Sequence, residues 1–260
     1  MKIWIQSGSA LATDSTNMYG SQYEQSLKKH FQEVARPGTT IELFGTERTP
    51  PGKDRYNSST HLVTSSIIRS AIRAEEEGYD VIAIVSTLDL GYDEIRELVD
   101  IPVVAITESS CYLSCLLASK FAFLPHNQKL LLRMTEMVKK FGLTERMVPG
   151  RHLNITYEDF PNMYKDPEPY INKFSEEARK VIEQGADILM IMGNPTNMFM
   201  VDQGVKEIDG VPILDVCGAV IKIAELVVDL KQMGINRSKQ GLLAAPSPEE
   251  IAQLRKFYND

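Results

Sequence analysis

The chain has 260 residues, of which 43% are hydrophobic and 24% are charged, and its formal net charge is −7. This composition is typical of a globular protein, and the length suffices for one large domain or for two lobes with separate cores. The acidic balance argues against a nucleic-acid surface, and no apolar run reaches the ~18 residues that a membrane span needs. We therefore expect a soluble protein that binds neither nucleic acid nor membrane.

The N-terminal sequence and the cysteines both indicate the cytoplasm. The start, MKIWIQSGSALATDS, has one lysine and a short apolar run, without the long apolar region of a signal peptide, so we interpret it as a first strand. Cys111, Cys115 and Cys217 are too few and too unevenly spaced for a disulfide scaffold or a zinc site. We expect a reducing compartment and no metal.

Short apolar runs alternate with longer amphipathic stretches along the chain. The runs cover residues 3–5, 40–44, 81–85, 103–106, 121–124, a weaker run that ends near residue 155, 188–192 and 211–214. Between them, residues 21–35 and 62–77 repeat apolar side chains at the three- and four-residue spacing of a helix. Such alternation predicts an α/β fold, in which helices cover both faces of a parallel sheet.

The last predicted helix, residues 247–258, has a start signal in its sequence. Ser247 is followed by Pro248 and, three residues after the serine, by Glu250. Serine and glutamate at this spacing form a capping box, and proline is favoured at the first helical position. We predict a helix that begins at Pro248.

The chain also repeats itself. EEGYDVIAIVS (76–86) matches EQGADILMIMG (183–193), DIPVVAI (100–106) matches GVPILDV (210–216), and KIWIQSGS (2–9) resembles KFAFLPHN (120–127) in pattern. A repeat of this length predicts two similar lobes, each with about four parallel strands. We assign residues 1–117 and 217–260 to the first lobe and 118–216 to the second, because the chain crosses back after Asp215.

The ends of the predicted strands carry polar residues that suit a ligand site. Open parallel sheets bind ligands beyond the carboxyl ends of their strands, and two facing lobes bring two such edges to one cleft. The candidates are Ser7, Ser9, Ser86, Thr87, His126, Asn127, Gly193, Asn194, Thr196 and Asn197, with Glu108 and Asp215 after the last strand of each half. Hydroxyl, amide and backbone N–H groups bind carboxylates and amides. Cations are few among these residues, so a polyphosphate ligand is not expected.

The stretches EEGYDVIAIVSTLDLGYDEIRELVDIPVVAI (76–106), GVPILDVCGAVIKIAELV (210–227) and SKQGLLAAP (238–246) resemble the aspartate/glutamate/hydantoin racemase superfamily, most closely its hydantoin and allantoin racemases. The resemblance implies two flavodoxin-like lobes with pseudo-twofold symmetry and a cleft between them. It also implies removal and return of a proton at a carbon next to a carbonyl. In that family two cysteines, one at the end of the third strand of each lobe, do this without a metal or a cofactor.

This chain departs from the family at both cysteine positions. Counting from Gly78 and Gly185, the first position holds Ser86 and the second holds Gly193, followed by Asn194. A thiol has an ordinary pKa of about 8.5, which a site can lower, whereas an alcohol is a far weaker acid, and glycine and asparagine cannot act as bases. We expect the fold and the pocket to carry over, but not the two-thiol mechanism.

Ser86 and His126 are the candidate catalytic residues. Ser86 has two interpretations. In the first it hydrogen-bonds a ligand or caps the next helix, and in the second it is a nucleophile that needs a base. His126 should face Ser86 from the other lobe, and an imidazole suits a base near neutral pH; the alternative is a surface or capping histidine. No G-x-S-x-G motif is present, and Glu108 or Asp215 would have to be the third member. His30, beside two lysines in a helix, should be solvated.

The cysteines leave a further alternative. Cys111 and Cys217 each follow a last strand by a few residues, so they form either a displaced thiol pair or, as is commoner, buried and inert side chains. Cys115 has the spacing of a core residue on a helix face.

Two segments have more than one interpretation. The loop PPGKDRYN (50–57) either covers the cleft, with Lys53, Arg55 or Tyr56 touching a carboxylate, or is an ordinary solvated loop. The aromatic- and proline-rich connection 156–170 is long for a plain linker. It is a lid, a contact between the lobes or an oligomer interface.

We predict a cytoplasmic, cofactor-free enzyme with two racemase-like lobes, which acts as a homo-oligomer on a small molecule. The substrate should be neutral or anionic, with carboxylate, amide or cyclic ureide character. Three hypotheses remain for its chemistry. The first is proton transfer at an activated carbon, with His126 or another group in place of the thiols. The second is hydrolysis or C–C or C–N cleavage with Ser86 and His126, and the third is binding without catalysis.

Overall fold

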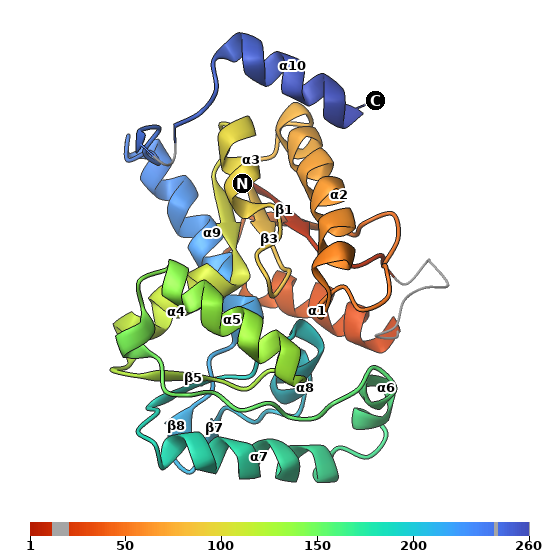
Figure 1. Ribbon diagram of the computed structural model, residues 1–260, viewed down its shortest axis with the longest axis vertical. Helices are drawn as coiled ribbons and strands as arrows, with labels where there is room; N and C mark the ends of the chain where they lie inside the picture. The colour runs from red at the N-terminus through yellow and green to blue at the C-terminus, as the bar shows by residue number, and fades with distance from the viewer. Residues whose placement is uncertain (12–20, 242–243, 260) are drawn as a thin grey trace.

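The first half of the chain forms a four-stranded parallel sheet in the order β2-β1-β3-β4, of which β1 and β3 are labelled in Figure 1. The computed structural model describes residues 1–11, 21–241 and 244–259, so parts of the stretches 1–15 and 238–246 lie outside the described residues. The strands are β1 (Lys2–Gln6), β2 (Thr40–Phe44), β3 (Val81–Ile84) and β4 (Val103–Ala105). The four apolar runs predicted in this half are therefore confirmed.

Helices cover both faces of this sheet, as the alternation predicted. Successive strand residues point to opposite faces, so Ile3 and Ile5 share a buried cluster with side chains of α1 and α9, whereas Trp4 packs with α2 and α3. The helices are α1 (Ser21–Val34), α2 (Asn57–Glu76), α3 (Tyr92–Leu98), α4 (Ile106–Leu117) and α9 (Val216–Gln232). Because both faces are buried, β3 is apolar at every position.

The second sheet is smaller than predicted. β5 (Phe121–Phe123) pairs in parallel with β6 (Ile188–Met190), and a parallel bridge flanks each of them, from Phe121 to Met147 and from Leu189 to Ile213. β7 (Glu207–Ile208) and β8 (Val211–Pro212) form a short antiparallel hairpin instead of a parallel strand. The two outer positions of the predicted four-stranded sheet are thus single bridges.

Prolines explain why the outer segments are not full strands. Residues 147–155 run beside β5, where the N–H of Arg151 donates to Phe123 O at 3.1 Å and that of Ile155 donates to His126 O at 2.9 Å. Pro149 lies within this segment and Pro212 lies within β8, and a proline cannot donate to a ladder. The weak run predicted to end near residue 155 is therefore an irregular neighbour of β5.

Aromatic side chains fill the core around the second sheet. Phe160, Phe174 and Phe199 pack there with Leu189, each fully or almost fully buried. The helices of this part are α5 (Gln128–Lys140), the 3₁₀ turn η1 (Thr144–Arg146), α6 (Asp159–Met163), α7 (Glu168–Ile182) and α8 (Asn194–Asp202). In the described part of the chain, no helix is both long and apolar enough to cross a membrane.

The C-terminal helices return to the first sheet. α9 contacts α1, α4, β3 and β4, and α10 (Pro248–Asn259) packs on α2; both are blue in Figure 1. The capping box is confirmed, since the N–H of Glu250 donates to Ser247 Oγ at 3.3 Å and the N–H of Ser247 donates to the Glu250 carboxylate at 2.8 Å. The division into lobes 1–117 with 217–260 and 118–216 stays a prediction, and one buried cluster contains residues of both.

Candidate active site

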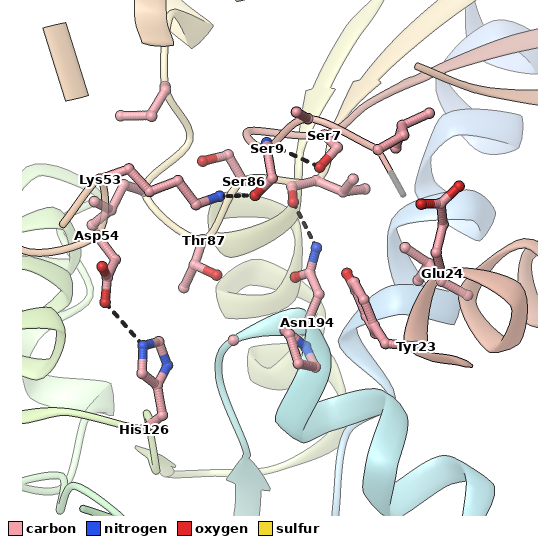
Figure 2. A pocket seen from close by; sticks show the side chains of 18 of the residues that line it. Ser7, Ser9, Tyr23, Glu24, Lys53, Asp54, Ser86, Thr87, His126 and Asn194 are labelled. Atoms are coloured by element: carbon pink, nitrogen blue, oxygen red, sulfur yellow. Dashed lines mark hydrogen bonds and ion pairs between the residues drawn. The ribbon is translucent and has the colours of Figure 1, made fainter. Parts of the chain in front are cut away.

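A cavity lies where the carboxyl ends of β1 and β3 face those of β5 and β6 (Figure 2). It has an empty volume of about 750 Å³, part of which is open solvent. Of the residues predicted at strand ends, those that line it are Ser7, Ser9, Ser86, Thr87, His126, Gly193 and Asn194. The cavity therefore takes polar groups from both halves of the chain.

On the wall formed by β1 and β3, a glycine makes room for two polar groups. Gly8 follows β1, and a Cβ atom at Gly8 would stand 2.8 Å from Ser86 Oγ and 3.6 Å from Lys53 Nζ. The first of these distances is too short for a real Cβ contact, so a side chain at position 8 would displace the Ser86 hydroxyl. The Ser86 hydroxyl and the Lys53 amine therefore share the space in front of Gly8.

On the opposite wall, formed by β5 and β6, a polar side chain again lies in front of a glycine, but the two strands exchange roles. Gly193, which connects β6 to α8, has a φ of 102°, and a Cβ atom there would stand 2.9 Å from His126 Nδ1. In the sequence repeat, Gly8 corresponds to His126 and Ser86 corresponds to Gly193. The polar side chain thus comes from the end of β3 in the first half and from the end of β5 in the second.

Asp54 orients the ring of His126. Its Oδ2 lies 2.9 Å from His126 Nε2 and accepts from Asn127 Nδ2 at 2.6 Å, and its Oδ1 accepts from the Tyr157 hydroxyl. Burial alone would raise the pKa of Asp54, but the hydrogen bonds from His126 and Tyr157 outweigh it and hold the pKa well below its ordinary range.

The protonation of this pair follows from the carboxylate. Because ionised Asp54 can only accept hydrogen bonds, a neutral His126 ring carries its proton on Nε2. Its Nδ1 atom is buried and has no hydrogen-bond partner among the described residues. The ring therefore has an unprotonated nitrogen beside Gly193, and both residues line the cavity.

Lys53 precedes Asp54 in the chain but points to the other wall. Its ammonium group donates to the carbonyl oxygen of Gly8 at 2.9 Å and to the Ser9 hydroxyl (Figure 2). Burial lowers the pKa of Lys53 to about 8, and the Asp54 carboxylate opposes this shift. Part of the side chain remains exposed, so the burial that shifts this pKa is that of the amine rather than of the whole side chain.

The loop 50–57 therefore reaches both walls of the cavity, which favours the first of its two interpretations. Lys53 and Asp54 line the cavity, and Asp54 was not among the predicted site residues. A Lys-Asp pair in a proline- and glycine-containing loop indicates only a solvated turn when it is seen in the sequence. Tyr157, which belongs to the connection 156–170, binds Asp54, so this connection contacts the loop.

Asn194 and helix α1 complete the cavity. Asn194 Nδ2 donates to Val85 O at 2.6 Å, and its Oδ1 atom is buried without a hydrogen-bond partner among the described residues. Tyr23 and Glu24 of α1 line another side of the cavity and were not predicted (Figure 2). The sequence feature that could have identified Glu24 is its position as a carboxylate on the buried face of an amphipathic helix.

Three predicted residues support the cavity from outside it. Asn127 caps α5, since its Oδ1 accepts from the N–H of Leu130 at 2.8 Å, and it also donates to Asp54. Thr196 Oγ1 donates to Gly193 O at 2.7 Å. Asn197 Nδ2 donates to Leu214 O at 3.1 Å. Their side chains satisfy backbone groups and hold the strand ends in place.

Glu108 and Asp215 are not among the described residues that line this cavity. The backbone N–H of Glu108 donates to the buried Asp89 carboxylate at 2.8 Å. Asp215 Oδ2 lies 2.6 Å from His30 Nε2, so His30 is not solvated as expected. Burial alone would lower the pKa of His30, but the Asp215 carboxylate outweighs burial and raises this pKa above its ordinary value. The carboxylate that pairs with His126 is Asp54 instead.

The cysteines do not reach the cavity. Cys111 and Cys217 are fully buried in the hydrophobic cluster around α9, and burial raises the pKa of each thiol. Neither lines the cavity among the described residues, which favours the inert interpretation over a displaced thiol pair. Within the described ranges, no group of three or more His, Cys, Asp or Glu side chains could hold a metal ion.

Comparisons with known proteins agree with this fold. The Asp/Glu/Hydantoin racemase family matches residues 19–224. A hydantoin racemase of Pseudomonas sp. (strain NS671) is 29% identical over 227 residues, which cover 87% of this chain and 88% of that one. A hydantoin racemase of Paenarthrobacter aurescens is 24% identical, covering 88% and 94%. An allantoin racemase from Klebsiella pneumoniae has a similar structure, with a TM-score of 0.78 at 18% identity over 95% of this chain and 94% of that chain.

Proposed function

Because this chain belongs to the Asp/Glu/hydantoin racemase family, we propose that it catalyses proton transfer at a carbon next to a carbonyl group. It is a racemase-like enzyme in which Ser86 and Gly193 stand where the resemblance implies thiols. The substrate is a small carboxylate, amide or cyclic ureide, and no cofactor takes part. Ser86 contacts the substrate from the wall formed by β1 and β3, which we call the first wall. His126 is the base of the opposite, second wall.

The observation that carries this proposal is the position of His126 Nδ1. The atom lies 2.9 Å from where a Cβ of Gly193 would stand, at one of the two positions implied for thiols. Asp54 keeps the ring proton on Nε2, so Nδ1 is the nitrogen that can accept a proton. An imidazole in a cavity wall, oriented by a carboxylate, is suited to general base catalysis near neutral pH. His126 therefore supplies the base that glycine cannot.

The proton transfer uses groups of the chain alone. When Nδ1 takes the proton, the electron pair of the C–H bond moves toward the carbonyl, whose oxygen becomes an enolate. The hydroxyls of Ser86 and Thr87 line the cavity and can donate hydrogen bonds to that oxygen. Donors held in place where negative charge develops lower the barrier most effectively. This environment supports a substrate with a carboxylate, amide or ureide carbonyl.

Hydrolysis by a Ser86 nucleophile has less support. A nucleophile and its base normally lie about 2.6–3.2 Å apart. In the described part of the chain no hydrogen bond joins Ser86 to His126, and each fills the space in front of a different glycine. The two residues therefore act from separate walls, which favours proton transfer.

The protein's assembly and location are further proposals that rest on the sequence. We propose a homo-oligomer in the cytoplasm that binds neither nucleic acid nor membrane. The net charge of −7 supports the absence of a nucleic-acid partner. Sedimentation velocity of the purified protein measures the oligomeric state, and a monomer would contradict this part of the proposal.

The decisive test of the chemistry is proton NMR in D₂O with hydantoins, ureido acids, imides and α-amino acids. We expect deuterium at the carbon next to the carbonyl of at least one compound. His126→Asn keeps the size of the side chain but removes the base, and it should slow labelling by about 10²- to 10⁴-fold. The matched control is His61→Asn, because His61 is exposed on α2 and is not part of the cavity.

Two results would contradict the proposal. A ring-opened or cleaved product without prior labelling at the carbon would make the protein a hydrolase or a lyase. Labelling at the same rate in His126→Asn and in the wild type would exclude His126 as the base. Circular dichroism and thermal unfolding of each variant confirm that a lost activity is not a lost fold.

A further inference from the structure

Inversion at carbon needs an acid–base group on each side of the substrate, and Ser86 is a poor one. A proton removed by His126 from one face must be replaced from the other face, otherwise the configuration is retained. Ser86 stands at the first position implied for a thiol, but an alcohol does not give up its proton near neutral pH as a thiol does. The first wall therefore needs another titratable group close to Ser86.

Lys53 is in that place. Its Nζ atom and Ser86 Oγ lie 3.6 Å and 2.8 Å from the same point, the Cβ that Gly8 lacks. Both residues line the cavity, and Figure 2 shows the amine on the side of Ser9 and Ser86, away from His126. Of the described cavity residues, Lys53 is the one with an amine side chain. The amine thus lies beside the first implied thiol position, and the imidazole lies beside the second.

Burial favours loss of the Lys53 proton. It lowers the pKa of Lys53 to about 8, against the Asp54 carboxylate, which raises this pKa. The amine itself lies against the first wall, where it donates hydrogen bonds to Gly8 O and Ser9 Oγ. An amine that titrates near the working pH can serve as both acid and base.

We propose that Lys53 is the acid–base group of the first wall, exchanging a proton with the substrate carbon from the side opposite His126. This inference rests on the proposed function and assigns the second group of that reaction. In one direction His126 Nδ1 takes the proton, the electron pair of the C–H bond moves onto the carbonyl as an enolate, and the Lys53 ammonium protonates the opposite face of the carbon. In the reverse direction the neutral amine takes the proton and the imidazolium returns one. Exchange with water restores the two groups.

A purely structural lysine would behave differently. If Lys53 only held the loop 50–57 or bound a substrate carboxylate, Lys53→Arg would keep its charge and much of its hydrogen bonding. A guanidinium cannot be deprotonated in a protein, so it cannot replace an acid–base group. Lys53→Arg and Lys53→Met together therefore separate the charge of the lysine from its ability to exchange a proton.

The experiment measures deuterium uptake and inversion for each enantiomer of a substrate found with the wild type. In Lys53→Met and Lys53→Arg, we expect inversion to fall at least 100-fold in both directions. The enantiomer whose proton faces His126 should still exchange it for deuterium, with retention of configuration, while the other enantiomer should not. His126→Asn should show the opposite preference. The matched control is Lys129→Met, an exposed lysine of α5, which should behave as wild type.

Each other result is informative. Inversion by Lys53→Arg within tenfold of the wild type would overturn the inference, because charge alone would then suffice. Loss of exchange for both enantiomers to the same extent, in variants that unfold at the wild-type temperature, would also overturn it. A wild-type protein that exchanges no enantiomer of any compound would instead contradict the proposed function itself.

Discussion

His126 Nδ1 occupies the space in which a side chain of residue 193 would begin, 2.9 Å from the Cβ that Gly193 lacks. The two residues come from different strand ends, β5 and β6, which pair in the second sheet. The glycine is thus a condition for the position of the imidazole. The position of the proposed base therefore depends on the absence of a side chain at residue 193, since such a side chain would displace the ring.

Gly193→Ala should remove activity and lower stability. The residue has a φ of 102°, where an L side chain is strained, and its new Cβ would also meet the imidazole. We expect a loss of about 1–3 kcal/mol in the free energy of unfolding from the backbone alone, and at least a 100-fold slower deuterium exchange. Urea unfolding and NMR measure the two effects. Gly185→Ala is the control, because its φ of 96° imposes similar strain with nothing within 4 Å; equal activities in the two variants would contradict the explanation.

Asp54→Asn should leave the protein folded but slow its deuterium exchange. The amide cannot hold the His126 proton on Nε2 as a carboxylate does, so the ring can adopt the other tautomer, with its proton on Nδ1. We expect exchange to slow by about 10²- to 10⁴-fold, and ¹⁵N NMR of labelled histidine should report the change of tautomer. Tyr157→Phe removes one hydrogen bond to the same carboxylate and should cost much less. An unchanged rate in Asp54→Asn would exclude this role.

The same carboxylate should make stability depend on pH. Its pKa in the folded state is well below the ordinary value, which is about 3.9 in the unfolded chain. A depressed carboxylate pKa contributes stability that is complete above the unfolded value and is lost as the pH falls toward the folded value. Urea unfolding below about pH 5 should therefore show a steeper loss for the wild type than for Asp54→Asn. Parallel curves for the two proteins would refute this prediction.

Inversion should decline on the alkaline side of about pH 8, where Lys53 loses its proton. In either direction of inversion, one of Lys53 and His126 must be protonated and the other neutral. Once this single shared proton is lost at high pH, the rates of both directions should therefore fall together. The Asp54 carboxylate opposes this loss of the proton, because its charge favours the protonated amine. The pH profile of kcat/KM measures this, and in Lys53→Met the remaining one-sided exchange should lack the alkaline decline. An alkaline decline that persists in this variant would have to come from another group.

Alkylation of thiols should leave the activity intact. Cys111 and Cys217 are fully buried, and burial raises the pKa of both thiols, so they are protected from iodoacetamide in the folded protein. Cys115 is partly exposed and should react first. Mass spectrometry locates the modification while deuterium exchange measures activity. Activity that disappears in proportion to the alkylation of Cys111 or Cys217 would restore a thiol mechanism.

Much of the fold could be predicted because local patterns carry it. The apolar runs at 81–85 and 188–192 became β3 and β6, and their match in the repeat placed Ser86 and Gly193 at one cavity. The outer strands of the second sheet were predicted less well, because Pro149 and Pro212 interrupt pairing that hydrophobicity alone suggested. Hydrophobic periodicity reports burial, whereas hydrogen-bonded pairing depends on each residue's N–H.

The candidate site was predicted in part. Residues at strand ends, such as His126 and Asn194, were found because the carboxyl edge of a parallel sheet is a general position for ligands. Asp54 and Tyr157 were missed as its partners, because a loop has no periodicity that says which wall it will reach. Glu24 was missed for a related reason, since the helix pattern shows which face is buried but not that a cavity lies against it.

The sequence by itself determined the two-lobed α/β class, the repeat that relates β3 to β6, and the absence of cysteine at both strand ends, since each depends on residues close together in the chain. Only the tertiary structure decided that Lys53 lies with Ser86 at Gly8, and that Asp54 binds His126 at Gly193. These pairs join residues far apart in the chain, and their contacts depend on angstrom-scale packing between glycine backbones and side chains. A one-dimensional pattern contains no such distances, so the chemistry of the cavity emerges only when the lobes and the loop are assembled.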